Sequence, residues 1–274
     1  MNRNMKLRLL CVCSVLLLVF SCTQVSITGR KQFNLVPDSM INSMSFDSYG
    51  EFLSNNKLSS NAGDTQMVKR IGVRIQKAVE RYCLENNKSE KLAGYEWEFN
   101  LIEDDAVNAW AMPGGKVVVY EGLIPVAQTE SGLAVVMGHE IAHAFARHGS
   151  ERMTQGLLVE LGGMALSEAL TKQPQKTQNL FLKSYTIGTE YGLLLPYSRV
   201  HESEADHLGL IFMAMAGYQP SEAVSFWERM AASKKESASP PELLSTHPSD
   251  ATRIRKIKEL LPEAQGYYIK ATGQ

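Results

Sequence analysis

The segment His139-Glu140-Ile141-Ala142-His143 follows the pattern His-Glu-x-x-His. Helix residues four positions apart lie one turn apart on the same face, so both imidazoles could bind one tetrahedral zinc ion. Glu140 would lie beside the metal and accept a proton from a zinc-bound water, whose pKa zinc lowers towards neutrality. Three fixed residues also recur by chance, but the apolar, helix-compatible flanks favour a buried active-site helix. The pattern predicts metal-assisted hydrolysis with Glu140 as the general base.

A catalytic zinc site needs a third protein ligand and an open fourth position. Glu202 and Asp206 lie four residues apart in a later segment and would share one helical face. Glu202 could bind the metal, while Asp206 could accept the second ring N–H of a zinc histidine. His201 is the rival ligand and His207 a weaker one. We expect Glu204 to belong to a solvated acidic face.

Helices and a small sheet must position these groups. Apolar residues at three- and four-residue spacing predict a helix over Asp64–Cys83, with Asp64 as its N-cap. Alternation from Tyr95 to Leu101 predicts a half-buried strand. Other strands are expected at 107–112 and 116–120, and other helices at 38–53, 133–148, 156–170, 197–215, 221–232 and from 247 onwards, with a linker over 233–241. The predicted fold class is α+β, mostly α-helical, with a small sheet beside the helix that carries His139.

The strand before that helix has a candidate role of its own. A strand edge near a metal can pair with an extended peptide backbone, which gives binding with little sequence demand. Asn108, Ala109 and Trp110 are the candidate substrate edge, just ahead of a Pro-Gly-Gly turn. The alternative is a plain core strand that ends in a tight turn.

The amino-terminal segment predicts export. Basic residues precede an apolar run, Leu9–Phe20, which is short for a membrane span and fits a signal-peptide core. The run leads into Ser21-Cys22, which resembles a bacterial lipobox, so Cys22 is the candidate lipidation site. We expect a signal peptide over 1–21, a lipidated tether over 22–37 and the catalytic domain over 38–274. Ordinary cleavage nearby and an uncleaved anchor are the alternatives.

Composition limits the function classes. The chain has 274 residues, 44% of them hydrophobic and 21% charged, with a formal net charge of −1. These values indicate an ordinary globular domain, without the basic charge that nucleic-acid binding needs. Of the four cysteines, two lie in the predicted signal peptide and Cys22 would carry lipid, so only Cys83 remains. We expect Cys83 in the core and no internal disulfide.

Several ordered segments together carry a family resemblance. They are Asn108–Gly115, Gly138–His148, Tyr197–Asp206, Ser245–Pro248 with Arg253, and the early Thr28-Gly29-Arg30. The chain thereby resembles the HtpX-like and CAAX-prenyl-protease family of gluzincin zinc metallopeptidases, and within it the periplasmic lipoprotein type exemplified by LoiP and BepA. The resemblance implies a minigluzincin fold with one Zn²⁺ per chain. It also implies zinc ligands His139, His143 and Glu202, general base Glu140, and Asp206 behind the ligands.

His247 is a candidate regulator. In the resembled lipoprotein-type members, a histidine in a His-Pro motif can occupy the remaining position on zinc and hold the enzyme inactive, and His247-Pro248 matches that motif. The alternatives are helix capping, which suits Pro248, and donation to the oxyanion of the transition state. Arg199 competes for the oxyanion role. His148 is expected to be a surface or structural residue.

The leading hypothesis is a zinc endopeptidase that cleaves misfolded or unassembled envelope proteins. It would be anchored by lipid in the bacterial cell envelope, on the outer membrane facing the periplasm rather than on the inner membrane. The outer-membrane assembly machinery is a candidate partner, and nucleic acid is not. The rival is a zinc-containing chaperone or binding module for outer-membrane protein assembly with little turnover. A third reading is a metal-assisted hydrolase of a non-peptide substrate.

Overall fold

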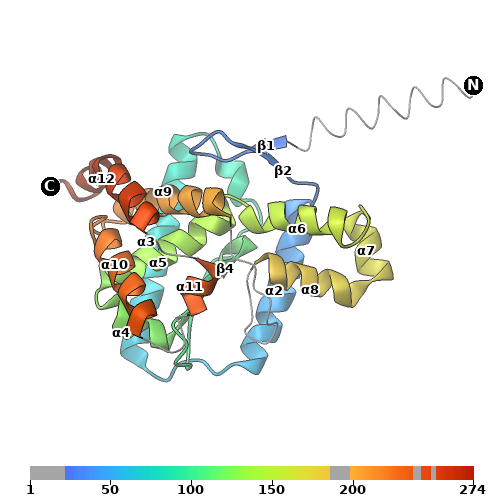
Figure 1. The fold of residues 1–274 in the computed structure, drawn as a ribbon, viewed down its shortest axis with the longest axis horizontal. Coiled ribbons are helices and arrows are strands. Elements are labelled where there is room, and N and C mark those ends of the chain that lie inside the picture. The colour runs from blue at the N-terminus through green and yellow to red at the C-terminus, as the bar shows by residue number, and fades with distance from the viewer. Residues whose placement is uncertain (1–21, 186–197, 237–241, 248–250) are drawn as a thin grey trace, which may run out of the picture.

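Helices surround a three-stranded sheet in the computed structural model, which describes residues 22–185, 198–236, 242–247 and 251–274 (Figure 1). The predicted signal peptide lies outside these residues. The helices are α2 (Asp38–Asn55), α3 (Ala62–Glu85), α4 (Ile124–Ala127), α5 (Glu130–Phe145), α6 (His148–Val159), α7 (Leu166–Lys172), α8 (Pro174–Ser184), α9 (Arg199–Met215), α10 (Glu222–Glu236), α11 (Glu242–Thr246) and α12 (Ala251–Thr272). The strands are β1 (Cys22–Gln24), β2 (Lys31–Phe33), β3 (Glu98–Ile102), β4 (Ala109–Met112) and β5 (Lys116–Tyr120). The predicted fold class is confirmed.

The main sheet has the order β3-β5-β4, with β3 parallel and β4 antiparallel to the central strand β5. Alternate side chains enter two different cores: Phe99 and Val117 join the core that contains α3 and α5, whereas Trp110 and Val118 join the core that contains α2 and α8. The expected half-buried strand is therefore buried on both faces, because helices cover both sides of the sheet. Strand β4 forms one edge of this sheet, next to α5.

The two helices that carry the chemistry, α5 and α9, pack directly on each other. Their backbones come close together at Gly138 and Gly209: a Cβ added to Gly209 would lie 2.9 Å from the backbone nitrogen of His139. Only glycine permits backbones to come this close. The glycine pair therefore brings the histidines of α5 within reach of the carboxylates of α9.

Two predicted helices have other boundaries than expected. The helix over 133–148 ends at Phe145, because Arg147 adopts a left-handed conformation with φ of 61°, and α6 begins at His148. The helix over 156–170 is divided into α6 and α7, and Gly162 and Gly163 between them have positive φ. Most of the expected linker, residues 237–241, lies outside the described residues, while α10 extends to Glu236.

The segment expected as a tether folds onto the helical part of the structure. Strands β1 and β2 form an antiparallel hairpin, and Val25 between them is buried. The Gln32 side chain donates a hydrogen bond to the Ala146 carbonyl at 2.6 Å, and the Lys88 ammonium donates to the Ser26 carbonyl at 3.0 Å. These contacts attach the hairpin to the end of α5 and to the loop after α3.

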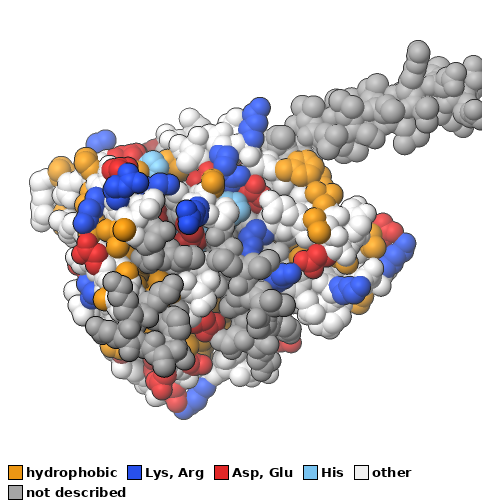
Figure 2. All heavy atoms as spheres, in the orientation of Figure 1, with side chains coloured by type: hydrophobic (Ala, Val, Ile, Leu, Met, Phe, Trp, Pro, Cys, Tyr) orange, Lys and Arg blue, Asp and Glu red, His pale blue; other side chains and the backbone are white. Residues whose placement is uncertain are grey.

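One face of the molecule carries a mixture of charged and apolar side chains. Figure 2 shows acidic and basic side chains interspersed over this face, with apolar side chains in several small groups among them. Within the described residues, no helix combines the length and the apolar character that a membrane crossing requires.

Candidate active site

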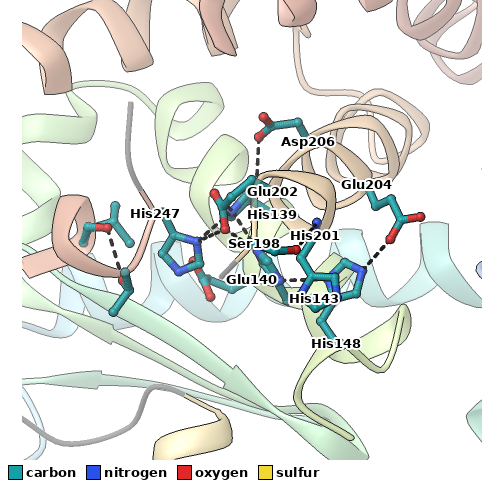
Figure 3. Close-up of polar contacts among 12 residues, drawn as sticks. His139, Glu140, His143, His148, Ser198, His201, Glu202, Glu204, Asp206 and His247 are labelled. Carbon is teal, nitrogen blue, oxygen red and sulfur yellow. Dashed lines mark hydrogen bonds and ion pairs between the residues drawn. The ribbon is translucent and has the colours of Figure 1, made fainter. Parts of the chain in front are cut away.

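Helix α5 presents both histidines of the His-Glu-x-x-His motif to one buried point. The Thr129 hydroxyl caps the helix by accepting from the Gly132 N–H at 2.9 Å. One turn apart on this helix, His139 and His143 turn their Nε2 atoms towards each other, 3.1 Å apart (Figure 3). Both rings are buried.

Helix α9 supplies the carboxylate. The Ser198 hydroxyl caps the helix start by accepting from the His201 N–H at 3.2 Å. The Glu202 carboxylate reaches His143 Nε2 at 3.2 Å and His139 Nε2 at 3.5 Å. The rival ligands lie elsewhere: His201 contacts a carboxylate oxygen of Glu151 at 3.1 Å, and His207 pairs with Glu263 on the surface.

These donor atoms match the spacing that a tetrahedral ion demands. Zinc ligands about 2.0–2.1 Å from the metal lie about 3.3 Å from one another. The separations among His139, His143 and Glu202 run from 3.1 to 3.5 Å. Two imidazoles and one carboxylate are also the ligand types that a catalytic zinc prefers. The residues therefore fit zinc in both chemistry and geometry.

His247 stands at the fourth corner of this cluster. Its Nδ1 lies 2.9 Å from Glu202 Oε1 and 3.1 Å from His139 Nε2. One ligand atom from each of the four residues lies within 4.8 Å of the others. On the other side of its ring, Nε2 is 3.3 Å from Glu140 Oε1. His247 thus lies between the three ligand side chains and the expected general base.

Glu140 is almost completely buried, and burial raises its pKa to about 7. Burial alone would also raise the pKa of Glu202, but the charges of His247 and Arg253 outweigh it and hold that pKa well below its ordinary value. Burial lowers the pKa of His143 well below its ordinary value, which keeps the ring neutral as a metal ligand must be. The cluster therefore combines an ionised ligand carboxylate with a base whose pKa lies near neutrality.

Asp206 supports the first histidine from behind. Its carboxylate lies 3.0 Å from His139 Nδ1 and accepts from Arg253 at 2.7 Å. The same guanidinium reaches Glu202 at 3.0 Å and lies 3.5 Å above the ring of Trp227. Arg253 therefore fixes two carboxylates of α9, those of Glu202 and Asp206, in place.

The remaining predicted site residues lie around this centre. Asn108, Ala109 and Trp110 are buried, at the start of edge strand β4 and just before it. The Leu243 N–H of α11 donates to the Val107 carbonyl at 3.2 Å, so α11 covers the beginning of that edge. Arg199 is exposed at the first position of α9. Cys22 has its backbone in β1, and its side chain lies outside the described residues.

Glu204 and His148 are both buried next to the ligand cluster. Glu204 is only 2% exposed, so the prediction of a solvated acid was wrong. The hairpin covers that side of α9, and the Arg30 Nε donates to Glu204 at 3.0 Å. His148 is fully buried, 3.0 Å from Glu204 and 2.9 Å from His143. The sequence feature that could have indicated this network is the presence of Thr28-Gly29-Arg30 and Arg147-His148 among the segments that carry the family resemblance.

Curated proteins with related sequences carry protease names. The chain is 36% identical over 244 residues to the mitochondrial metalloendopeptidase OMA1 of Schizosaccharomyces pombe. This alignment covers 88% of this chain and 67% of that protein. It is 34% identical over 183 residues to the OMA1 of Saccharomyces cerevisiae, an alignment that covers 65% of this chain and 50% of that protein. It is 32% identical over 162 residues to the beta-barrel assembly-enhancing protease of Escherichia coli, an alignment that covers 58% of this chain and 33% of that protein. The match thus spans half or less of the length of the last two of these relatives.

The predicted location is wrong by this comparison. The two yeast relatives are named mitochondrial enzymes, and their matches cover more of this chain than the match to the E. coli protein does. They overturn the expectation of a lipid-anchored protein of the bacterial envelope, on the outer membrane facing the periplasm. A short apolar run followed by Ser-Cys carries little information about the compartment, and the longer alignments outweigh it.

A family model extends over most of the chain. The model described as peptidase family M48 matches residues 73–261. This range contains both histidines of α5, Glu202 and His247. Because the matched residues make up more than half of the chain and include the whole metal-ligand cluster, the chain belongs to peptidase family M48, whose metal is zinc.

Proposed function

We propose that the chain is a zinc-dependent endopeptidase that cleaves unfolded or unassembled proteins. One observation carries the proposal: His139, His143 and Glu202 present their donor atoms at the separations of a tetrahedral zinc site, with Glu140 beside the fourth corner. The family membership and the protease names of the relatives support the same activity.

The side chains divide the work of peptide hydrolysis between them. Zinc held by the three ligands would act as a Lewis acid and lower the pKa of a coordinated water towards 7. Glu140, with its own pKa near 7, takes the proton of the nucleophile and can pass it to the leaving amine. Asp206 and Arg253 keep the ligands oriented, so little reorganisation is needed during the reaction.

Strand β4 suits an extended substrate. It is the edge strand on the side of the sheet that packs against α5, so a paired peptide would run past the metal. Backbone pairing needs a chain in extended conformation rather than a particular sequence. Unfolded or unassembled proteins provide such segments, whereas compact domains do not.

The same geometry supports a closed resting state. His247 Nδ1 stands where the fourth zinc ligand would be, and its Nε2 contacts Glu140, so a nucleophilic water has no room there. Helix α11, which carries the chain into His247, also bonds to the Val107 carbonyl at the start of β4. Activation would then require the movement of one short segment that covers both metal and substrate edge. Replacing His247 with alanine should raise peptidase turnover.

The test uses a casein-like unfolded substrate and the Glu140→Gln variant. The variant should bind zinc like the wild type and show no cleavage, because only the base is removed. Glu130→Gln is the matched control: Glu130 begins the same helix and pairs with Arg70 at the surface, so its activity should be unchanged.

Two outcomes would contradict the proposal. One is full cleavage by Glu140→Gln. The other is zinc-loaded protein that cleaves nothing, either as wild type or as His247→Ala. The second outcome would favour the chaperone or binding module instead.

A further inference from the structure

We propose that Arg30 of the N-terminal hairpin, together with Glu204, positions the zinc ligand His143 through the ring of His148. The proposal concerns positioning residues and rests on the ligand set proposed above. It assigns a function to a network outside the metal cluster, in which the N-terminal hairpin meets helices α6 and α9.

The network begins at the back of His143. Its Nε2 faces the metal cluster, while its Nδ1 lies 2.9 Å from His148 Nδ1 (Figure 3). His148 turns its Nε2 to Glu204 Oε2 at 3.0 Å. Glu204 in turn accepts from Arg30 Nε at 3.0 Å and from the Thr28 hydroxyl at 2.6 Å. The contacts run without interruption from the hairpin to the ligand.

Proton positions along this path are fixed by chemistry. A carboxylate only accepts hydrogen bonds, so Glu204 requires the proton of His148 on Nε2. His148 Nδ1 is then an acceptor, and His143 Nδ1 must be the donor. That tautomer leaves the lone pair of His143 on Nε2, the atom that faces the cluster. Each ring carries one proton, and the arrangement matches the neutral imidazole that zinc binds.

Arg30 fixes the network from two sides. Its guanidinium donates to Glu204 through Nε and to both carboxylate oxygens of Glu151 through Nη1 and Nη2, at 2.9 and 2.8 Å. Glu151 lies 3.1 Å from His201, whose ring stacks on His148 with centroids 4.4 Å apart. The planar guanidinium of Arg30 therefore positions the Glu204 carboxylate beside His148. Through the second carboxylate, Glu151, it also positions the His201 ring that stacks on His148.

The two zinc histidines thus have parallel supports. His139 is oriented by Asp206, which accepts from Arg253 of α12. His143 is oriented by His148 and Glu204, which accepts from Arg30 of the hairpin. An arginine from each end of the described chain completes the ligand geometry.

Residues other than Arg30 also attach the hairpin to the helices. Gln32 of the hairpin donates to the Ala146 carbonyl, and Lys88, after α3, donates to the Ser26 carbonyl of the hairpin. Loss of Arg30 should therefore disturb the His148 network more than the attachment of the hairpin. A variant that weakens the attachment elsewhere provides the comparison.

The experiment measures the rate of zinc loss to a chromophoric chelator from the full chain. Arg30→Gln and Glu204→Gln should each lose zinc about 10–100-fold faster than the wild type, as expected when the partner that orients a metal ligand is removed. The double variant should lose zinc no faster than the faster single variant, since both changes break one path. Arg30→Lys should restore part of the retention, because an ammonium can pair with Glu204 but cannot bridge both carboxylates.

Lys88→Met is the matched control, because Lys88 contacts the hairpin at Ser26 and not the network. It should lower the melting temperature of the metal-free protein and leave the rate of zinc loss unchanged. The proposal is overturned if Arg30→Gln and Glu204→Gln retain zinc like the wild type, or if Lys88→Met loses it equally fast. Failure of the proposed function is a separate result, in which the wild type binds no zinc or His143→Ala keeps it.

Discussion

Replacing Gly209 with alanine tests whether the crossing of α5 and α9 sets the metal geometry. The added Cβ would meet backbone atoms at 2.9 Å from the His139 nitrogen and 3.0 Å from the Gly138 carbonyl carbon. Backbone atoms cannot rotate away as a flexible side chain can. The helices must therefore move apart, and Glu202 must move with α9 away from the two histidines.

The size of the effect follows from that contact. Reaching an ordinary separation of 3.4 Å requires the helices to part by about 0.5 Å. Overpacking costs about 1–3 kcal/mol, while alanine improves helix propensity by about 1 kcal/mol, so the net loss of stability is about 0–2 kcal/mol. A misplacement of about 1 Å can lower a rate by about 10²-fold, so half of it corresponds to about tenfold in turnover. Gly209→Ala should thus lower turnover about tenfold even where the protein remains folded.

The assay combines zinc affinity, cleavage of an unfolded protein and thermal melting. Gly138→Ala should be milder, because its Cβ would lie 3.0 Å from a single Gly209 oxygen. Gly50→Ala is the control: it lies in α2 with nothing within 4 Å, so zinc binding and turnover should not change. Wild-type zinc affinity and turnover in Gly209→Ala would refute the argument.

Two further predictions concern buried charges. Arg253→Met should destabilise the protein by about 3–5 kcal/mol in urea unfolding, because the buried carboxylates of Asp206 and Glu202 would both lose the guanidinium that pairs with them. A destabilisation no larger than that of a variant at an exposed lysine would contradict this. In the metal-free protein, burial raises the pKa of Glu140 from 4.5 to about 7. The stability linked to this shift is present below pH 4.5 and is lost as pH rises through 7, by about 3 kcal/mol at most. Glu140→Gln should therefore raise the melting temperature at pH 8 and not at pH 4, and equal effects at both values would contradict this.

Local periodicity predicted the elements well where spacing alone defines them. The helix expected over Asp64–Cys83 is observed as α3, with its apolar stripe in the core. Its cap is Asn61, whose side chain accepts from the Asp64 N–H, because the helix starts earlier than the stripe indicates. The four-residue spacing of His139 and His143 likewise brings both rings to one point without reference to the rest of the fold.

Contacts between distant segments could not be predicted in this way. Glu204 lies two positions from Glu202 and therefore on a different side of α9. Whether that side is solvated depends on what covers it, and the covering residue, Arg30, is 174 positions away in the chain. The same applies to the sheet, where burial of both faces depends on helices from separate parts of the sequence. Periodicity within one element contains no information about such coverage.

The central claim is most directly tested by the zinc content of the purified chain, beside its Glu202→Ala and His207→Ala variants. Both residues lie on α9, but only Glu202 reaches the two motif histidines. We predict about one zinc per chain for the wild type and for His207→Ala, and almost none for Glu202→Ala. Full zinc occupancy in Glu202→Ala, or its loss in His207→Ala, would contradict the proposed site.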